Sequence, residues 1–185
     1  MGYVIDGGQV KQKQYNENTG LESLEIVNIS KVQAIQRAGR AGRTREGKCI
    51  RLYAESFYDE QMPNITLPEI LRVNLTSTVL TLKSLGIEDV INFEYMDKPN
   101  TKQLQNSLIM LRHLEAVSSS GRLTNLGREL AKLPIDPCFA KALLYGELLD
   151  NSKRSKVQED ILKLVSVLST ENIFANVSRN DSRAQ

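Results

Sequence analysis

The sequence predicts a mixed α/β amino-terminal part with a β-hairpin, followed by a mostly helical part. Short β-branched runs bounded by turn residues stand before residue 54, whereas leucines at helical spacing dominate after Pro68. The chain has 185 residues, 41% hydrophobic and 25% charged, which is typical of globular domains. No apolar run approaches the roughly 18 residues needed to cross a bilayer, so we expect no membrane span.

The amino-terminal part is expected to contain strand, hairpin, helix and strand in that order. The first strand is stopped by a turn at Asp6–Gly8 and begins so abruptly that we expect further sequence ahead of it. A polar loop separates the next two strands, as in a hairpin, and Ser30 is a favoured N-cap for a helix running toward Gly42. The four strands are expected at Tyr3–Ile5, Lys11–Tyr15, Leu21–Ile29 and Cys49–Tyr53.

The second part is expected to be helical except for one small ribbon. Gly86 suits the position after a helix, and Thr124 suits the cap of another. A turn at Ser118–Gly121 between them makes the order compatible with a winged helix. The longer helices are expected at Leu75–Leu85, Thr101–Leu114, Phe139–Leu149 and Val157–Leu168.

The candidate functional residues lie in a basic cluster. Seven of the 24 lysines and arginines lie between residues 31 and 51. At about 100° per residue, Gln36, Arg40 and Arg43 fall within roughly 60° of one another on a helix, whereas Arg37 points away. Two guanidiniums and an amide suit a phosphate whose charge grows in a transition state. From spacing alone, a solvated basic helix end is an equally good interpretation.

Two glycines interrupt this expected helix. Gly39 and Gly42 each cost a helix about 1 kcal/mol relative to alanine, so we expect another backbone or a ligand to approach closely there. Gly42–Cys49 nearly matches a phosphate-binding P-loop, but Cys49 replaces the Mg²⁺-binding hydroxyl and the segment leads into a strand. We therefore reject a P-loop.

The run Gln36-Arg-Ala-Gly-Arg-Ala-Gly-Arg43 resembles motif VI of superfamily 2 helicases, and the DEAH-box RNA helicases in particular. The similarity extends from residue 3 to about residue 174, and Gln9 departs from the aromatic residue expected there. Further matching segments are Tyr3–Gly8, Gly47–Tyr53, Pro68–Ile70, Leu82–Ile87, Leu123–Arg128 and Pro134–Pro137.

The resemblance implies a role for each candidate residue. Arg40 and Arg43 look like arginine fingers that reach the γ-phosphate of ATP, and Gln36 looks like the residue that positions the attacking water. Asp6 is a candidate for the nucleotide-side cleft, although a strand-end aspartate that caps a turn is favoured. Apart from the resemblance, the direction of Arg37 on the helix favours a structural role for it as an ion-pair partner. The hairpin candidates for contact with RNA phosphate or base are Lys11, Lys13 and Tyr15, and for each of them a solvated surface position is an equally good interpretation.

The resemblance also implies a domain plan and cofactors. Residues 1–56 would form the end of a second RecA-like lobe, 57–128 a winged helix and 129–185 the start of a ratchet-like bundle. ATP and Mg²⁺ would be held mainly by a first lobe outside this chain, so the chain alone is expected to be inactive. The two cysteines and His113 have no metal-ligand spacing, which favours structural roles.

The implied function is ATP-driven 3′-to-5′ RNA translocation or remodelling of RNA–protein complexes. The implied partners are RNA and a glycine-patch activator, in the nucleus or alternatively the cytoplasm. Two other interpretations stay open. The chain could be a winged-helix module that binds nucleic acid or protein without hydrolysis, or part of a helicase directed to DNA.

Overall fold

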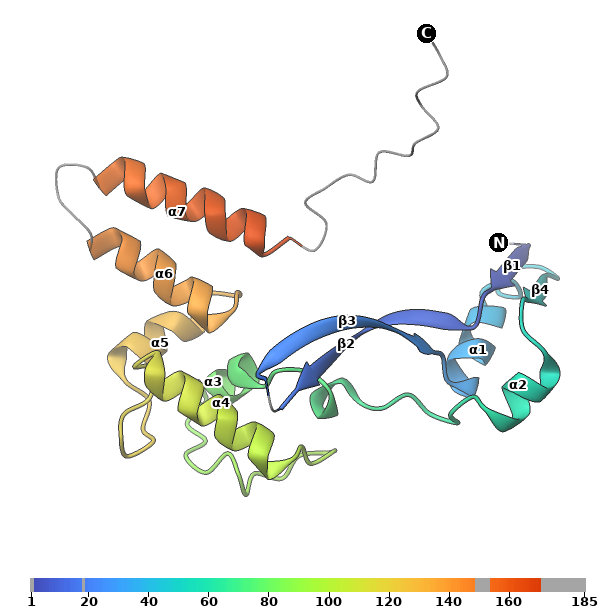
Figure 1. Ribbon diagram of the computed structural model, residues 1–185, viewed down its shortest axis with the longest axis horizontal. Helices are drawn as coiled ribbons and strands as arrows, with labels where there is room; N and C mark the ends of the chain where they lie inside the picture. The colour runs from blue at the N-terminus through green and yellow to red at the C-terminus, as the bar shows by residue number, and fades with distance from the viewer. Residues whose placement is uncertain (1, 18, 149–153, 171–185) are drawn as a thin grey trace, which may run out of the picture. The chain divides into compact units, whose positions relative to one another are not determined.

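The computed structural model describes residues 2–17, 19–148 and 154–170. The chain forms two compact units, one made of residues 1–75 and 91–107 and the other of residues 76–90 and 108–185. In the described residues the strands lie within the first 51 positions, and the elements after them are helices and one 3₁₀ turn, apart from one isolated bridge (Figure 1). The expected order, a mixed α/β part followed by a mostly helical part, is therefore confirmed for the described residues.

The first unit contains two small sheets. Strand β1 (Tyr3–Asp6) pairs in parallel with β4 (Lys48–Arg51), and β2 (Gln9–Asn16) pairs antiparallel with β3 (Leu21–Asn28). All four expected strands are present. The hairpin begins two residues earlier than expected, and the last strand ends two residues earlier.

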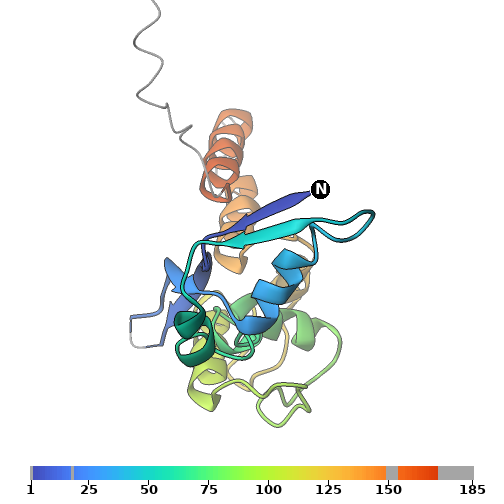
Figure 2. The same ribbon diagram turned by 90° about the vertical axis from the view of Figure 1, so that its right-hand side faces the viewer.

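Helix α1 (Lys31–Ala38) lies against one face of the β1–β4 pair (Figure 2). The core beneath it is built on Ile29, Ala34 and Met62, all at most 5% exposed. Apolar side chains on the other face of the pair are more than half exposed, although parallel sheets are usually covered on both faces. These side chains are Tyr3, Ile5, Ile50 and Leu52.

The start of α1 is as expected. Ser30 accepts a hydrogen bond from the backbone N–H of Gln33, and the Gln33 side chain accepts one from the backbone N–H of Ser30. This reciprocal pair is a capping box, which satisfies two donors at the helix start. A threonine from the following linker, Thr66, also donates to the Ser30 hydroxyl at 2.9 Å.

The expected end of α1 near Gly42 is wrong, because the helix stops at Ala38 with Gly39 as its cap. The next residues form tighter turns, in which the N–H of Arg40 bonds to the carbonyl of Arg37 at 3.1 Å. Two glycines within four residues lower the helical propensity at the point where the chain must turn back toward β4.

The linker after β4 contains two elements that the sequence did not reveal. Helix α2 spans Glu55–Glu60, and a single 3₁₀ turn, η1, spans Glu69–Leu71. The Tyr58 ring of α2 lies under the Arg51 guanidinium, 4.7 Å from ring centroid to carbon. This cation–π contact ties α2 to the end of β4.

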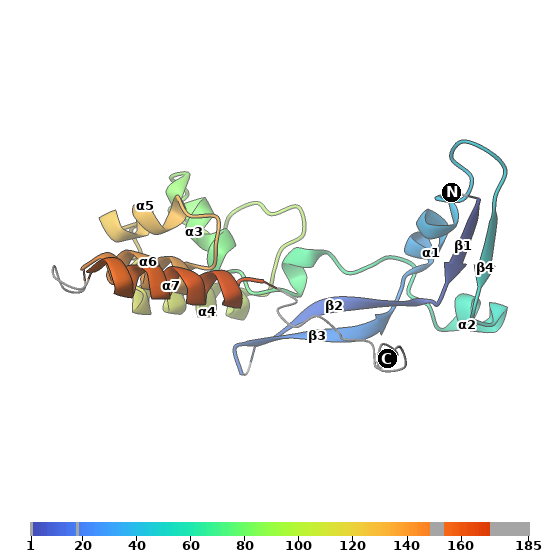
Figure 3. The same cartoon turned by 90° about the horizontal axis from the view of Figure 1, so that it is seen from above.

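The second unit is a stack of helices. Within it α3 packs on α5, α5 on α6 and α6 on α7 (Figure 3). An isolated antiparallel bridge joins Val117 to Leu123 across a short turn, as in a minimal wing. The helices are α3 (Thr76–Ser84), α4 (Thr101–His113, which begins in the first unit), α5 (Asn125–Ala131), α6 (Pro137–Leu148) and α7 (Arg154–Leu168).

Two expected helix ends in this unit, the cap at Thr124 and the end at Gly86, are confirmed. Helices α6 and α7 begin two and three residues earlier than expected, and Leu149, the expected last residue of the former, lies outside the described residues. The Thr124 hydroxyl accepts a hydrogen bond from the N–H of Gly127, and Gly86 follows α3 with a φ of +89°. Gly127 also lies so close to the carbonyl of Ala116 that a side chain there would overlap it. Among the described residues, no helix has the length and apolar character that a membrane crossing requires. The domain boundaries after residues 56 and 128 stay predictions.

Candidate functional site

The three residues of the predicted phosphate site lie at the end of α1 and in the turns after it. Gln36 is in the last turn of the helix, and Arg40 and Arg43 follow its end. The helical-wheel argument for Arg40 and Arg43 is therefore wrong, because the helix ends at Ala38. The turns nevertheless keep all three residues within one eight-residue segment.

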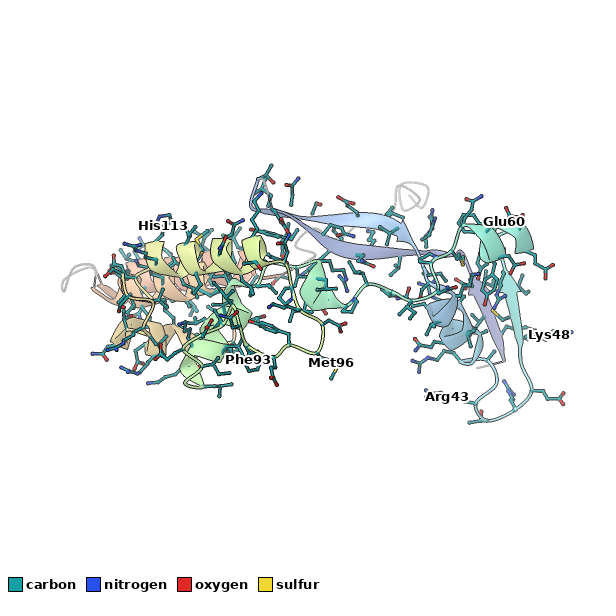
Figure 4. The ribbon with its side chains drawn as sticks, turned by 90° about the horizontal axis from the view of Figure 1, so that it is seen from below. Arg43, Lys48, Glu60, Phe93, Met96 and His113 are labelled. Atoms are coloured by element: carbon teal, nitrogen blue, oxygen red, sulfur yellow. The ribbon has the colours of Figure 1, made fainter. Side chains whose placement is uncertain are left out.

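All three side chains are exposed and free of internal partners. Within the part of the chain that the structure describes, neither arginine forms a side-chain hydrogen bond or ion pair, and nor does Gln36. Arg43 lies on the loop that joins α1 to β4 (Figure 4). The guanidiniums of Arg40 and Arg43 are thus available to an external anion, which is the condition that a phosphate contact requires.

The close backbone approach expected at Gly39 and Gly42 occurs instead at Gly47. A Cβ on Gly42 would meet nothing within 4 Å, and one on Gly39 would make only ordinary contacts at 3.5 Å or more. A Cβ on Gly47 would overlap the backbone of Ala41, which is 2% exposed. This contact closes the loop that carries Arg43 back onto itself.

The loop borders an open hollow of about 820 Å³. Neither Arg40 nor Arg43 lines it, so the hollow and the predicted phosphate site are separate features. Sequence reasoning did not single out the hollow, although its basic residues belong to the cluster noted above. It is lined by Gly2, Tyr3, Gly42, Arg45, Glu46, Gly47 and Lys48. The same loop leads into β4 and not into a helix, which agrees with the rejection of a P-loop.

Asp6 is a buried carboxylate at the end of β1, with 1% of the residue exposed. Its Oδ1 accepts hydrogen bonds from the Gly8 N–H at 3.0 Å and from Arg37 Nη1 at 2.8 Å, and its Oδ2 accepts one from the Tyr53 hydroxyl at 3.0 Å. Burial acts to raise the pKa of Asp6, but the three hydrogen bonds and the charge of Arg37 outweigh it and lower the pKa. The turn-capping interpretation is confirmed.

Arg37 forms the ion pair that its direction predicted. Its Nη1 bonds to the carboxylate of Asp6, while its Nη2 donates to the backbone carbonyl of Gln9 at 3.0 Å. Sequence reasoning missed Tyr53 as the third member of this network. Burial, followed by the hydrogen bond to Asp6 and its negative charge, raises the pKa of Tyr53.

The predicted RNA contacts share one face of the hairpin. Lys11, Lys13 and Tyr15 alternate along β2, so their side chains leave the ribbon on the same side. The register places Lys11 opposite Ile26 and Lys13 opposite Leu24, and these two aliphatic residues are 64% and 58% exposed. This face combines cations, an aromatic ring and exposed apolar groups, which suits contact with a single strand of nucleic acid.

The far end of the hairpin is held by contacts that the sequence did not reveal. The Asn100 amide donates to both carboxylate oxygens of Glu17, at 3.1 and 3.3 Å, and the N–H of Asn74 donates to Glu22 at 2.6 Å. Arg72 donates to the carbonyl of Lys13 and accepts from the N–H of Tyr15. The hairpin is therefore fixed away from its root as well as at it.

The remaining candidates have no feature of a metal or redox site. No group of three or more potential metal ligands occurs among the described residues. His113 is exposed at the end of α4. Both cysteines are free, and burial together with Asp136 raises the pKa of Cys138 to about 11, which keeps its thiol protonated at neutral pH.

Two segments of the chain match known families. Residues 107–135 match the winged-helix part of the helicase associated domain (HA2), and residues 136–185 match its ratchet-like part. The second match includes residues 149–153 and 171–185, which lie outside the described part of the chain. The winged helix expected from the helix order is thereby supported.

Curated relatives extend the similarity to nearly the whole chain. The protein named "Probable ATP-dependent RNA helicase DHX40" is 44% identical over 172 residues in Homo sapiens, in Rattus norvegicus and in Pongo abelii. The match covers 93% of this chain and 21% of each relative, so the chain spans about a fifth of the length of these relatives. The resemblance deduced from the motifs is confirmed.

Proposed function

We propose, on the premise that this chain carries the helicase-associated region of a DEAH-box RNA helicase, that it works within an ATP-driven enzyme that moves along RNA. In this proposal the chain supplies residues to an ATP site shared with a lobe outside the chain. It also supplies a hairpin that contacts RNA and the helical region that passes movement onward.

The observation that carries the proposal is the state of Arg40 and Arg43. Both are exposed and have no internal partner among the described residues, whereas the neighbouring Arg37 is committed to Asp6. A buried or paired arginine could not reach a ligand from another module without breaking existing contacts. These two can do so without such a cost.

The chemistry that these residues can perform is charge stabilisation. Each guanidinium can donate two hydrogen bonds to a phosphate, and such contacts strengthen as charge develops on the transferred phosphoryl group. The Gln36 amide can orient the attacking water. ATP is the substrate and Mg²⁺ its counter-ion, and both would be held mainly by the other lobe. An arginine finger contributes about 10³- to 10⁵-fold in rate in phosphoryl transfer generally.

The hairpin face supports the RNA side of the proposal. Lys11 and Lys13 suit phosphates, and Tyr15 suits a stacked base. We further propose 3′-to-5′ movement, a nuclear location with the cytoplasm as the alternative, and a glycine-patch activator as partner. In this proposal Asp6 does not contact the nucleotide directly, because both of its carboxylate oxygens accept hydrogen bonds from neighbouring residues. Its role is to hold Arg37, which is next to Gln36 in the chain.

The test is Arg43→Ala in the full-length helicase that contains this chain. We expect RNA-stimulated ATP hydrolysis to fall by about 10³-fold or more, with RNA affinity in the absence of nucleotide changed less than about threefold. The matched control is Arg122→Ala, which removes the same charge from an exposed position in the turn of the wing and should leave hydrolysis unchanged.

The non-catalytic alternative predicts the opposite pattern. If the chain is a winged-helix binding module, nucleic-acid affinity should depend on the wing and fall with Arg122→Ala, while Arg43→Ala should change nothing. Hydrolysis that survives Arg43→Ala would therefore contradict the proposed function.

A further inference from the structure

We propose that Arg37 is a positioning residue that couples the phosphate-facing turn to the RNA-facing hairpin. This inference rests on the proposed function, because it assigns a shared residue to the two sites named there. Arg37 itself contacts neither ATP nor RNA in this proposal. It acts through its backbone contact with Arg40 of the phosphate site and through its side-chain contact with Gln9 at the start of the hairpin.

The side chain of Arg37 joins two strands that belong to different sheets. Its Nη1 lies 2.8 Å from Oδ1 of Asp6, the last residue of β1, and its Nη2 lies 3.0 Å from the carbonyl oxygen of Gln9, the first residue of β2. The guanidinium therefore bridges the end of the parallel pair and the root of the hairpin.

The backbone of Arg37 contacts the proposed phosphate site, which contains Gln36, Arg40 and Arg43. Its carbonyl oxygen accepts a hydrogen bond from the N–H of Arg40 at 3.1 Å, in the turn that ends α1. Arg37 also directly follows Gln36 in the chain. When Arg40 moves toward or away from a phosphate, this turn must adjust. Its adjustment acts on the residue whose side chain holds the hairpin root.

The hairpin can transmit such a change because its other end is fixed. The carbonyl of Lys13 accepts a hydrogen bond from Arg72 at 3.2 Å, and the N–H of Tyr15 bonds to the carbonyl of Arg72 at 2.8 Å. A ribbon held at both ends responds to movement at its root by changing twist between the two anchors. Lys11 lies on that stretch, and Lys13 lies at its far anchor.

Arginine suits this role because the two contacts are made by two different nitrogens, Nη1 and Nη2, whereas all three donors of a lysine share one nitrogen. The planar fork of arginine presents several donors at fixed angles, so one side chain can bond to two acceptors at once, whereas lysine presents a single ammonium. Lysine at position 37 would keep a positive charge beside the buried carboxylate of Asp6 and lose the simultaneous bond to Gln9. Arg37→Lys therefore separates the coupling contact from the ion pair.

The experiment measures coupling directly in the full-length helicase. The affinity for a single-stranded RNA oligonucleotide is measured by fluorescence anisotropy without nucleotide and with ADP–beryllium fluoride, and the ratio of the two is the coupling factor. We expect Arg37→Lys to bring this ratio at least about fivefold closer to one, since coupling free energies between sites correspond to about 5- to 150-fold. Hydrolysis without RNA should stay within about twofold of wild type.

The control is Lys31→Gln on the same helix. Its ammonium bonds to the carbonyl of Asp59 and does not reach the hairpin, so the coupling factor should stay unchanged. If Arg37→Lys does not fold, the double variant Asp6→Asn with Arg37→Gln leaves no unpaired buried charge and should show the same loss of coupling.

A coupling factor within twofold of wild type in the foldable variant overturns the inference, as does an equal loss in the Lys31→Gln control. A role confined to folding would lower the melting temperature and leave the ratio intact. The failure of this inference is distinguishable from failure of the proposed function, because the latter is decided by hydrolysis in Arg43→Ala.

Discussion

At the scale of single residues, the fate of each arginine in the motif follows from what lies next to it. Arg37 has a buried carboxylate within 2.8 Å and is committed to it. Arg40 and Arg43 stand beyond the helix end with no acidic neighbour bonded to them among the described residues. In the proposal, these three arginines therefore have different functions. Arg37 forms an internal ion pair, whereas Arg40 and Arg43 contact a phosphate from outside the chain.

The Asp6 network predicts an acid-sensitive contribution to stability. Asp6→Asn should lower the free energy of unfolding at neutral pH by about 1–3 kcal/mol, because Arg37 loses its charged partner. The folded-state pKa of Asp6 is depressed, so its contribution is present above the unfolded-state pKa of about 3.9 and is lost as the pH falls through the folded-state value.

This prediction is checked by urea unfolding of both proteins at a series of pH values. The difference between them should shrink as the pH falls below about 4. The prediction fails if the two proteins are equally stable at neutral pH, or if the difference does not change with acidification.

At the scale of elements, the loop after α1 depends on one glycine. Gly47→Ala should lower the free energy of unfolding by about 1–3 kcal/mol, because the new methyl group would overlap the backbone of Ala41. Gly42→Ala, in open space on the same loop, should change it by less than about 1 kcal/mol. Thermal unfolding of the two variants decides this, and equal stability of the two would contradict the assignment.

Elements whose limits depend on local chemistry were predictable from the sequence. Ser30 and Thr124 cap helices through their own side chains, and Gly86 ends a helix with a positive φ, so each signal and its effect lie within a few residues. The end of α1 was predicted wrongly, because the helical-wheel argument extended the helix through Gly39 to Gly42 on the basis of side-chain periodicity. The turn after Ala38 also depends on contact between Ala41 and Gly47.

Contacts between distant residues were beyond a sequence pattern. The direction of Arg37 suggested an ion pair, but nothing local identified Tyr53, 47 residues from Asp6, as a donor to the same carboxylate. The bonds from Asn100 to Glu17 span 83 residues and join two polar segments that would each pass for a solvated loop. Such pairs depend on the fold that brings them together.

At the scale of the whole molecule, the proposed function assigns only part of an ATP site to this chain and the rest to a lobe outside it. We expect the purified chain to show no RNA-stimulated hydrolysis, since its described residues include no metal-ligand group and its sequence contains no accepted P-loop. A phosphate-release assay with and without RNA checks this. Turnover that is abolished by Arg43→Ala would show that the chain needs no partner lobe.

The same assay on the full-length protein separates the RNA and DNA interpretations. Stimulation by single-stranded RNA that exceeds stimulation by DNA of the same sequence supports the RNA assignment. Equal or greater stimulation by DNA supports the DNA-directed alternative, because the hairpin's cations and aromatic ring suit the backbone and bases of either strand.

One detail of the hairpin root bears on how this protein can vary over evolution. Arg37 holds the root through a peptide oxygen, not through the side chain at position 9. Every residue type carries that oxygen, so Gln9 can stand where an aromatic residue was expected without breaking the link. The hydrogen bond does not depend on which residue type occupies position 9, so substitutions at that position leave the contact of the Arg37 guanidinium unchanged.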